Sequence, residues 1–229
     1  MTLTDKLSEV KEAKDLQKYF EEVADILLNK GKLVINKTEY RLTEIEFYYR
    51  DENKHNDTFT HCDKEQLKNG TWYFHASGID ITFGKGENEI YGGILLRAIT
   101  LASNTDEKKN QQNDVYGPLK LRNLTECDYK NLKDNVRGKN CTDQSCSIYW
   151  KDDDVFKNME NTLQSLAVPR VGLILKGKYI DLKKEFINKP YRFIIYPMKE
   201  HKGKESIIAK DWNDEVKFKE VFGYNLAKK

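Results

Sequence analysis

The chain has 229 residues, of which 38% are hydrophobic and 33% charged, so it can bury one substantial core, and large-scale disorder is excluded. Its formal net charge of +2 permits contact with phosphates without demanding it. Residues 1–22 contain no apolar run typical of a signal sequence, and no later run is long enough to span a membrane. We therefore expect a soluble cytoplasmic protein without a membrane partner.

The first part of the chain predicts a helix followed by a hairpin. Between Asp15 and Asn29, apolar residues recur at steps of three and four, which is typical of an amphipathic helix that ends before Gly31. Residues 33–35 and 40–49 are rich in strand-forming residues, and four polar residues separate them. This pattern favours two antiparallel strands joined by a short connection.

The middle of the chain predicts a β-sheet. Residues 50–69 are polar and are expected to form a loop beside that sheet, where binding residues often collect. Residues 71–75, 79–83 and 90–101 have the composition of strands, with turn-forming residues between them. The sheet would therefore be built mainly from hairpins, which make it antiparallel.

The remaining elements are weaker. A surface loop is predicted at 104–113, and weak helices are predicted at 121–132 and 154–166. Two strands are predicted at 171–175 and 191–196, and a closing helix at 211–222. No repeat or linker divides the chain. We expect one α+β domain over 1–229, a mainly antiparallel curved sheet with flanking helices, whose core spans about 15–197 and whose C-terminal extension spans 198–229.

Cysteine and histidine spacing gives no metal signature. The four cysteines lack paired CxxC spacing, and the four histidines form no HExxH motif. A zinc site can be assembled on paper from Cys141, Cys146, His61 and Cys62, but free thiols are the simpler interpretation. We expect no metal.

The segment 41–49 carries the first functional signal. Strand alternation puts Glu44, Glu46 and Tyr48 on one face and Thr43, Ile45 and Phe47 on the other. Charges on a solvated strand face can serve merely to prevent aggregation. The alternative is a site with two carboxylates beside an aromatic ring.

Arg97 strengthens the second interpretation, because it lies in an otherwise apolar strand, where a charge is costly unless paired. Glu46 and Glu44 are candidate partners, and Asp80 is a third. The pair could be purely structural. It could also keep one carboxylate ionised as a general base that activates a water. The ring of Tyr48 would then suit a flat substrate such as a nucleobase, since stacking contributes about 1–3 kcal/mol per base.

Seven short segments, in order, resemble the alkyladenine (3-methyladenine) DNA glycosylases, whose fold is similar to the formyltransferase C-terminal domain. They match the family's opening helix and strand, E-T-E-A-Y, P-G-x-x-Y-V-Y, L-[LI]-R-A, G-P-x-K-L, R-[IV]-G and K-P-x-R-F, and lie at 23–34, 44–48, 70–74, 95–98, 117–121, 170–172 and 189–193. The resemblance implies a DNA-repair enzyme that flips and excises a base from double- or single-stranded DNA, as a monomer and without a cofactor.

The resemblance also implies roles for particular residues. Glu46 would deprotonate the water that attacks C1′ of the flipped nucleotide, and Arg97 would lie beside that carboxylate and water. Tyr48 and His75 would stack on the base. A family histidine in the following loop would fall near Asp57 by strict spacing, so either His55 or His61 would take its place.

Two departures bear on substrate choice. The hairpin that carries the family's duplex-wedging tyrosine is one residue shorter here, so the wedge is absent or is replaced by Ile79. Phe83 and Gly84 stand where the family has a discriminating asparagine. Two alternatives to a DNA glycosylase therefore remain: a non-catalytic nucleic-acid-binding relative, and an N-glycosidase acting on free nucleosides or RNA.

Overall fold

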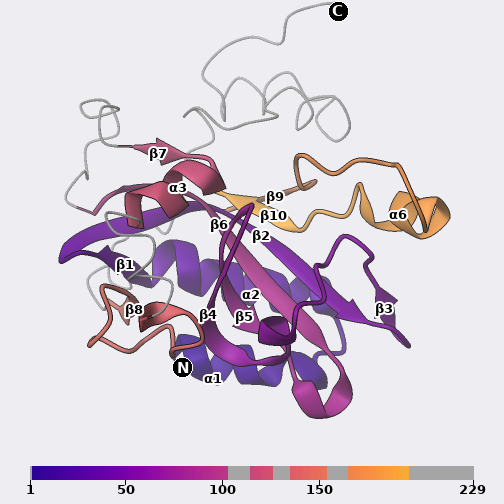
Figure 1. The fold of residues 1–229 in the computed structure, drawn as a ribbon, viewed down its shortest axis with the longest axis horizontal. Helices are drawn as coiled ribbons and strands as arrows, with labels where there is room; N and C mark the ends of the chain where they lie inside the picture. Colours follow the sequence, from indigo (N-terminus) through magenta and orange to yellow (C-terminus); the bar gives the residue numbers. More distant parts are fainter. Residues whose placement is uncertain (1, 103–113, 126–134, 154–164, 196–229) are drawn as a thin grey trace, which may run out of the picture.

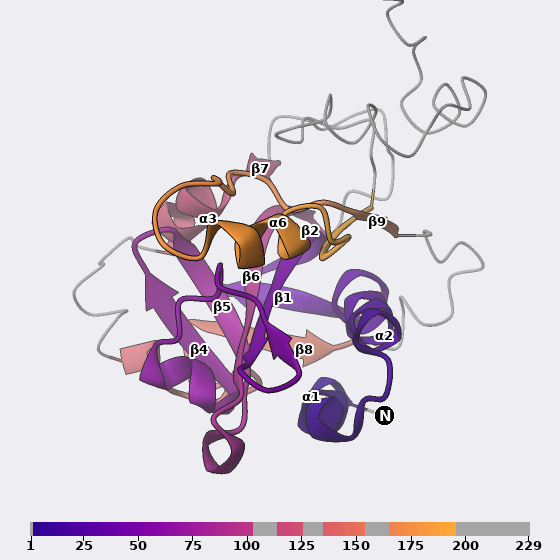
Figure 2. The same ribbon diagram turned by 90° about the vertical axis from the view of Figure 1, so that its right-hand side faces the viewer.

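The computed structural model describes residues 2–102, 114–125, 135–153 and 165–195. In these residues the protein is a mixture of helices and strands, organised around one open antiparallel sheet (Figure 1). Helices α1 (Leu3–Ser8) and α2 (Leu16–Asn29) lie together on one side of the sheet, whereas α3 (Pro118–Thr125) and α6 (Ile180–Phe186) lie away from them (Figure 2). Within the described ranges, no helix is long and apolar enough to cross a membrane.

In the described part of the chain the sheet has ten strands, and all the pairings there are antiparallel. The strands are β1 (Gly31–Ile35), β2 (Thr38–Asp51), β3 (His55–Asn56), β4 (Asn69–His75), β5 (Gly78–Phe83), β6 (Tyr91–Leu101), β7 (Val115–Tyr116), β8 (Ile148–Asp152), β9 (Leu166–Val168) and β10 (Arg192–Ile194). The main path runs β4-β5-β6-β2-β1-β8, while β10 joins β2 to β9, β3 pairs with β2, and β7 pairs with β6. Three short 3-10 helices complete the described elements, at Glu9–Glu12, Lys64–Leu67 and Gly86–Asn88.

Helix α2 confirms the amphipathic pattern read from the sequence. The side chain of Asp15 caps its N-terminus by accepting a hydrogen bond from the backbone N–H of Lys18 at 3.1 Å. Its apolar side is buried against the sheet, where the ring of Phe20 stacks on that of Phe47 with centroids 4.5 Å apart. The main hydrophobic core therefore lies between α2 and one face of the sheet.

The predicted hairpin forms, with a tighter turn than expected. Thr38 and Glu39 already pair with Ile35 and Val34, so the turn contains only Asn36 and Lys37. Both have positive φ, 47° and 69°, as a type I′ turn requires.

The strands predicted at 71–75, 79–83 and 90–101 are confirmed as β4, β5 and β6, and the strand at 191–196 is represented by β10. The strand predicted at 171–175 is wrong: these residues are irregular, and Gly172 has a φ of +80°. The backbone N–H of Val171 donates to the side chain of Glu46 instead of to a neighbouring strand.

Other boundaries also differ from the predictions. The loop expected at 50–69 contains β3 and a short 3-10 helix, and the weak helix at 121–132 begins earlier, at Pro118. Helices α1 and α6 and strands β7, β8 and β9 were not predicted. The predictions for 104–113 and 211–222, and nearly all of that for 154–166, lie outside the described residues.

Candidate functional site

A cavity of about 700 Å³ lies on the face of the sheet opposite α2. Strand β2 contributes Tyr48 to its lining, the β4–β5 hairpin contributes His75 and Asp80, and β6 contributes Arg97. The start of α3, residues 171–173 and three residues between β3 and β4, Phe59, His61 and Gln66, also line it. The alternating residues of the same strands point the other way into the core, as Phe47 does.

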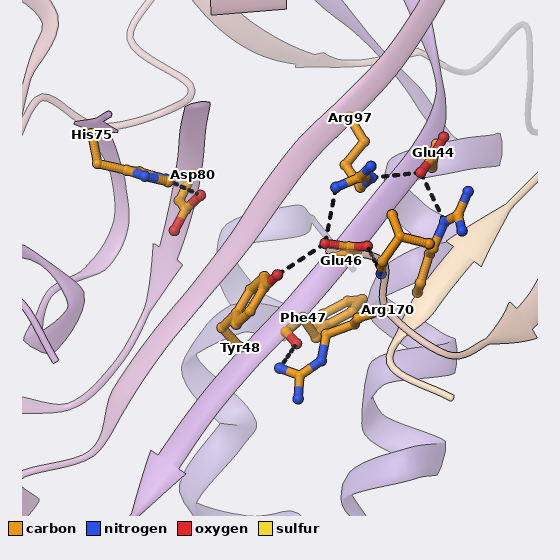
Figure 3. A network of polar contacts seen from close by, with 10 residues as sticks. Glu44, Glu46, Phe47, Tyr48, His75, Asp80, Arg97 and Arg170 are labelled. Atoms are coloured by element: carbon orange, nitrogen blue, oxygen red, sulfur yellow. Dashed lines mark hydrogen bonds and ion pairs between the residues drawn. The ribbon is translucent and has the colours of Figure 1, made fainter. Parts of the chain in front are cut away.

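Glu46 lies behind this lining, and its side chain is fully buried. Figure 3 shows its carboxylate between Arg97 and Tyr48. Oε2 accepts hydrogen bonds from the Arg97 guanidinium at 3.1 Å and from the Tyr48 hydroxyl at 2.9 Å, and Oε1 accepts one from the backbone N–H of Val171 at 2.9 Å. Because a carboxylate has about four acceptor positions, roughly one remains for a water or substrate proton.

Arg97 bridges the two carboxylates predicted as its partners. Its Nε donates to Glu44 at 2.5 Å, and Glu44 also accepts a hydrogen bond from Nε of Arg192 at 2.8 Å. Burial opposes the charged form of Arg97, but the nearby Glu46 and Glu44 outweigh that effect and raise its pKa. For Arg192 burial dominates and lowers the pKa. Two buried carboxylates, of Glu44 and Glu46, thus face two buried guanidinium groups, of Arg97 and Arg192. We call these four residues the ionic quartet.

The register of β2 and β6 brings Arg97 to this position. Pairing passes from Leu42 opposite Ile99 to Glu44 opposite Ala98 and then to Ile45 opposite Leu96. One residue on each strand is skipped, Thr43 on β2 and Arg97 on β6, so two bulges compensate each other. Bulges of this kind often re-aim side chains beside functional sites.

Tyr48 is held by a second buried ion pair. The Arg170 guanidinium lies 4.6 Å from the centre of the Tyr48 ring, and it donates to Asp57 at 2.7 Å and to the Phe47 carbonyl at 3.1 Å. Burial, followed by the charge of Glu46, raises the pKa of Tyr48 well above its ordinary value. The hydroxyl therefore stays protonated at neutral pH and donates to Glu46.

The opposite wall is built around His75. Its Nε2 lies 2.9 Å from Asp80 Oδ1, and its Nδ1 accepts a hydrogen bond from the Ser77 backbone at 3.2 Å. This pattern places the proton of a neutral ring on Nε2. The ring of Tyr73 stacks on His75 at 4.9 Å, and the edge of His61 approaches at 4.8 Å. Burial, and then His75, lower the pKa of His61.

The structure distinguishes between the two candidate histidines. His61 lines the cavity, whereas His55 packs against Tyr49, Phe186 and Tyr191, outside the lining. Burial lowers the pKa of His55 to about 4. His61 is therefore the one available to a ligand.

Two further expectations need correction. Ile79 is fully buried in the hydrophobic core, so it is not available as a wedge that enters a duplex. Asp80 reaches the cavity, but its partners are His75 and, at 3.5 Å, Gln66 rather than Arg97.

Asp57, Arg170 and Arg192 also belong to the site, and none of the three was predicted as a site residue from the sequence. Arg192 stands between Tyr191 and Phe193, so the reasoning applied to Arg97 would have singled it out. Asp57 lies in a polar stretch, near the position where the family histidine falls by spacing, and its ion pair with Arg170 shows its place in the site.

The described residues contain no group of three or more His, Cys, Asp or Glu arranged to hold a metal ion. Cys62, Cys141 and Cys146 are free thiols, and burial raises the pKa of Cys141 to about 12. Cys127 and His201 lie outside the described residues.

The fold and site define an α+β protein in which a buried Glu–Arg cluster lies behind a cavity with aromatic walls. The chain matches no family model. It is 30% identical, over 204 residues, to "Uncharacterized protein L759" of Acanthamoeba polyphaga mimivirus, and the match covers 78% of this chain and 86% of that protein. The chain therefore belongs to the same family as this mimivirus protein.

Proposed function

We propose that the protein is a DNA glycosylase-like hydrolase that cleaves the N-glycosidic bond of a damaged or modified base, with a fold like that of the alkyladenine DNA glycosylases. The observation that carries the proposal is the buried Glu46 carboxylate, which accepts hydrogen bonds from Arg97 and Tyr48, two residues that line the cavity together with His75. The open antiparallel sheet and the ordered motifs support the proposed fold.

In the proposed reaction, Glu46 accepts a proton from a water as the water oxygen bonds to C1′ of the bound nucleotide. The bond between C1′ and the base nitrogen breaks, and its electron pair leaves with the base. Tyr48 and His75 would hold the base between flat surfaces, which stacking favours by about 1–3 kcal/mol per base. The chemistry requires no cofactor.

Arg97 and Val171 would position the base catalyst. Both donate to Glu46, and both line the cavity, so a water that reaches Glu46 passes beside them. The guanidinium also places a positive charge beside the carboxylate. Hydrogen bonds of a catalytic group often adjust only in the substrate complex, so the buried position of Glu46 is compatible with this role.

A second candidate is a nucleic-acid-binding protein without catalysis. The supporting observation is that Glu46 has no exposed surface and already accepts hydrogen bonds from three donors. The burial of Ile79 bears on the substrate, because a hydrolase without that wedge would act most easily on a base that needs no extrusion from a duplex. Single-stranded DNA, RNA and free nucleosides meet this condition.

The test is base release, measured by mass spectrometry, from methylated, deaminated and phage-modified DNA in single- and double-stranded form. Free nucleosides and RNA are assayed in parallel. We expect Glu46→Gln to lose roughly 10²- to 10⁴-fold in rate, the usual contribution of one general base. Glu39→Gln, at the start of the same strand and paired with Lys32 in the wild type, is the matched control and should retain its rate.

Each outcome decides between the candidates. Release that Glu46→Gln abolishes and Glu39→Gln retains supports the hydrolase and identifies the base. Salt-sensitive DNA binding with no release from any substrate would instead support the non-catalytic binder. A cytoplasmic, monomeric enzyme is part of the same proposal.

A further inference from the structure

In the described ranges, the large exposed apolar side chains lie on two segments, each of which also contributes residues to the cavity lining. Among the described residues, five large hydrophobic side chains are exposed: Leu119, Ile174, Leu175, Tyr179 and Ile180. Leu119 itself lines the cavity. Ile174 and Leu175 follow directly after Leu173, which also lines it, and Tyr179 and Ile180 come a few residues later. We call these five residues the apolar rim.

The exposure of the apolar rim is large. Tyr179 is 63% exposed and Ile174 is 56% exposed, although the opposite face of the sheet is closely covered by α1 and α2. The rim belongs to two segments distant in sequence, the start of α3 and the connection from β9 to α6, and both lie away from α1 and α2 (Figures 1 and 2). Large exposed apolar side chains on segments that border a cavity are typical of a binding surface.

Lysines alternate with the apolar residues on the same segments. Lys120 follows Leu119, and Lys176 and Lys178 lie between Leu175 and Tyr179. All three are exposed, and none forms an ion pair with another residue in the described part of the chain. Residues 171–189 contain five lysines against two acidic residues, so this side of the cavity is positive although the whole chain is nearly neutral.

We infer that the apolar rim and its lysines form a nucleic-acid docking surface, with aliphatic and aromatic side chains against the bases that flank the bound nucleotide and lysines on their phosphates. The choice of partner rests on the proposed function, because a cavity that receives one base must bring the neighbouring nucleotides onto its rim. Apolar side chains that unstack base steps are a common device of DNA-bending proteins. The rim thus supplies the wedge that the buried Ile79 cannot.

The inference is tested by binding to a fluorescent duplex with a central reduced abasic site, which contains no base to release there, so binding is measured independently of chemistry. Two double variants are compared, Ile174→Ser with Leu175→Ser and Lys176→Ala with Lys178→Ala. A third, Lys11→Ala with Lys14→Ala, lies among exposed residues near α1 and α2 and is the matched control. Since all of these side chains are exposed, the melting temperatures should stay close to the wild type.

The two rim variants should differ in their salt dependence. The serine variant should lose roughly tenfold in affinity for the abasic duplex, equivalent to about 1.4 kcal/mol, with an unchanged slope of log K against log salt. The lysine variant should weaken binding to all DNA, and the magnitude of its slope should fall by about 1 for each phosphate that a lysine no longer neutralises. The control variant should bind like the wild type.

The failures are distinguishable. If both rim variants bind DNA like the wild type, the inference is overturned, whatever base release shows. The same holds if the serine variant instead abolishes self-association or binding to anionic vesicles and leaves DNA binding intact. If rim-dependent DNA binding occurs but no substrate releases a base, the docking surface stands and the proposed hydrolase fails.

Discussion

The two faces of the sheet are made by the same strands and stabilised in different ways. On the face covered by α2, Ile45, Phe47 and Phe193 are buried among other apolar side chains. On the opposite face, the neighbouring residues Glu44, Glu46 and Arg192 are equally buried, but as charges. Strand alternation alone separates the two environments.

Equally buried residues on the two faces should therefore differ in how well they tolerate substitution. Apolar burial contributes about 25 cal/mol per Å² and is not directional, so the loss of one methyl group costs only about 0.5–1.5 kcal/mol. A buried ion cluster is stable only while every charge retains its partner. The cavity face should therefore respond far more strongly to a change of one residue.

The largest effect should follow Arg97→Met. This change removes the residue that bridges Glu44 and Glu46, and breaking a buried ion pair costs about 3–5 kcal/mol. Urea denaturation followed by circular dichroism measures the free energy of unfolding. If the free energy of unfolding falls by less than about 1 kcal/mol, water or other donors must replace Arg97 as the partner of Glu44 and Glu46. The two faces of the sheet would then not differ in their response to substitution.

Replacing all four charges sharpens this test. The variant Glu44→Leu, Glu46→Leu, Arg97→Met and Arg192→Met should be about as stable as the wild type, because apolar replacements of a buried cluster are often neutral or stabilising. Stability retained together with loss of base release would indicate that the ionic quartet serves function rather than folding. A variant that fails to fold would assign the quartet a role in specifying the structure.

A smaller effect is expected for Tyr48→Phe. The ring stays against Arg170, but Glu46 loses one of its three donors, and a hydrogen bond to a charged group contributes about 1.5–3 kcal/mol. Thermal melting should show the loss, while affinity for DNA should be retained because stacking needs only the ring. Tyr149→Phe on β8 removes a hydroxyl away from the cavity, and a comparable loss there would show that the effect is not specific to Glu46.

Ile45→Val measures how much a change of one residue on the apolar face lowers the free energy of unfolding. Ile45 lies between Glu44 and Glu46 on the same strand, with its side chain fully buried, and removing one methyl group typically costs about 0.5–1.5 kcal/mol. Base release should stay unchanged. If this substitution costs as much as Arg97→Met under the same denaturation conditions, the two faces do not differ as proposed.

The smallest effect concerns pH and His55. Above its ordinary pKa of 6.5 the ring is neutral in both states, whereas between 6.5 and about 4 only the unfolded chain takes up the proton. Stability should therefore fall as the pH falls through this window, by less than about 1 kcal/mol at pH 6, because the ring is partly exposed.

His55→Phe keeps an aromatic ring beside Phe186 and should make the unfolding free energy less dependent on pH. The pKa of His61 is also lowered by burial, so part of the dependence should remain. An identical pH profile in the variant and the wild type would exclude His55 as its source.

Several helices and strands, and the site residues on one strand, could be predicted from the sequence alone. Helix α2 and the strands around Glu46 follow from apolar periodicity, and the shared face of Glu44, Glu46 and Tyr48 follows from alternation. The cost of a buried charge identified Arg97 and required an acid for it. These predictions depend only on which residues are neighbours in the chain and on the general cost of burying a charge. Both are known before the structure is.

The residues of the site that are far from β2 in the sequence could be identified only from the tertiary structure. It paired Arg170 with Asp57, turned the Val171 N–H toward Glu46, brought His61 rather than His55 to the cavity, and buried Ile79. Each of these depends on contacts between segments far apart in the chain or on the register of neighbouring strands. Local periodicity carries no information about such contacts, because they are selected by the packing of the whole chain.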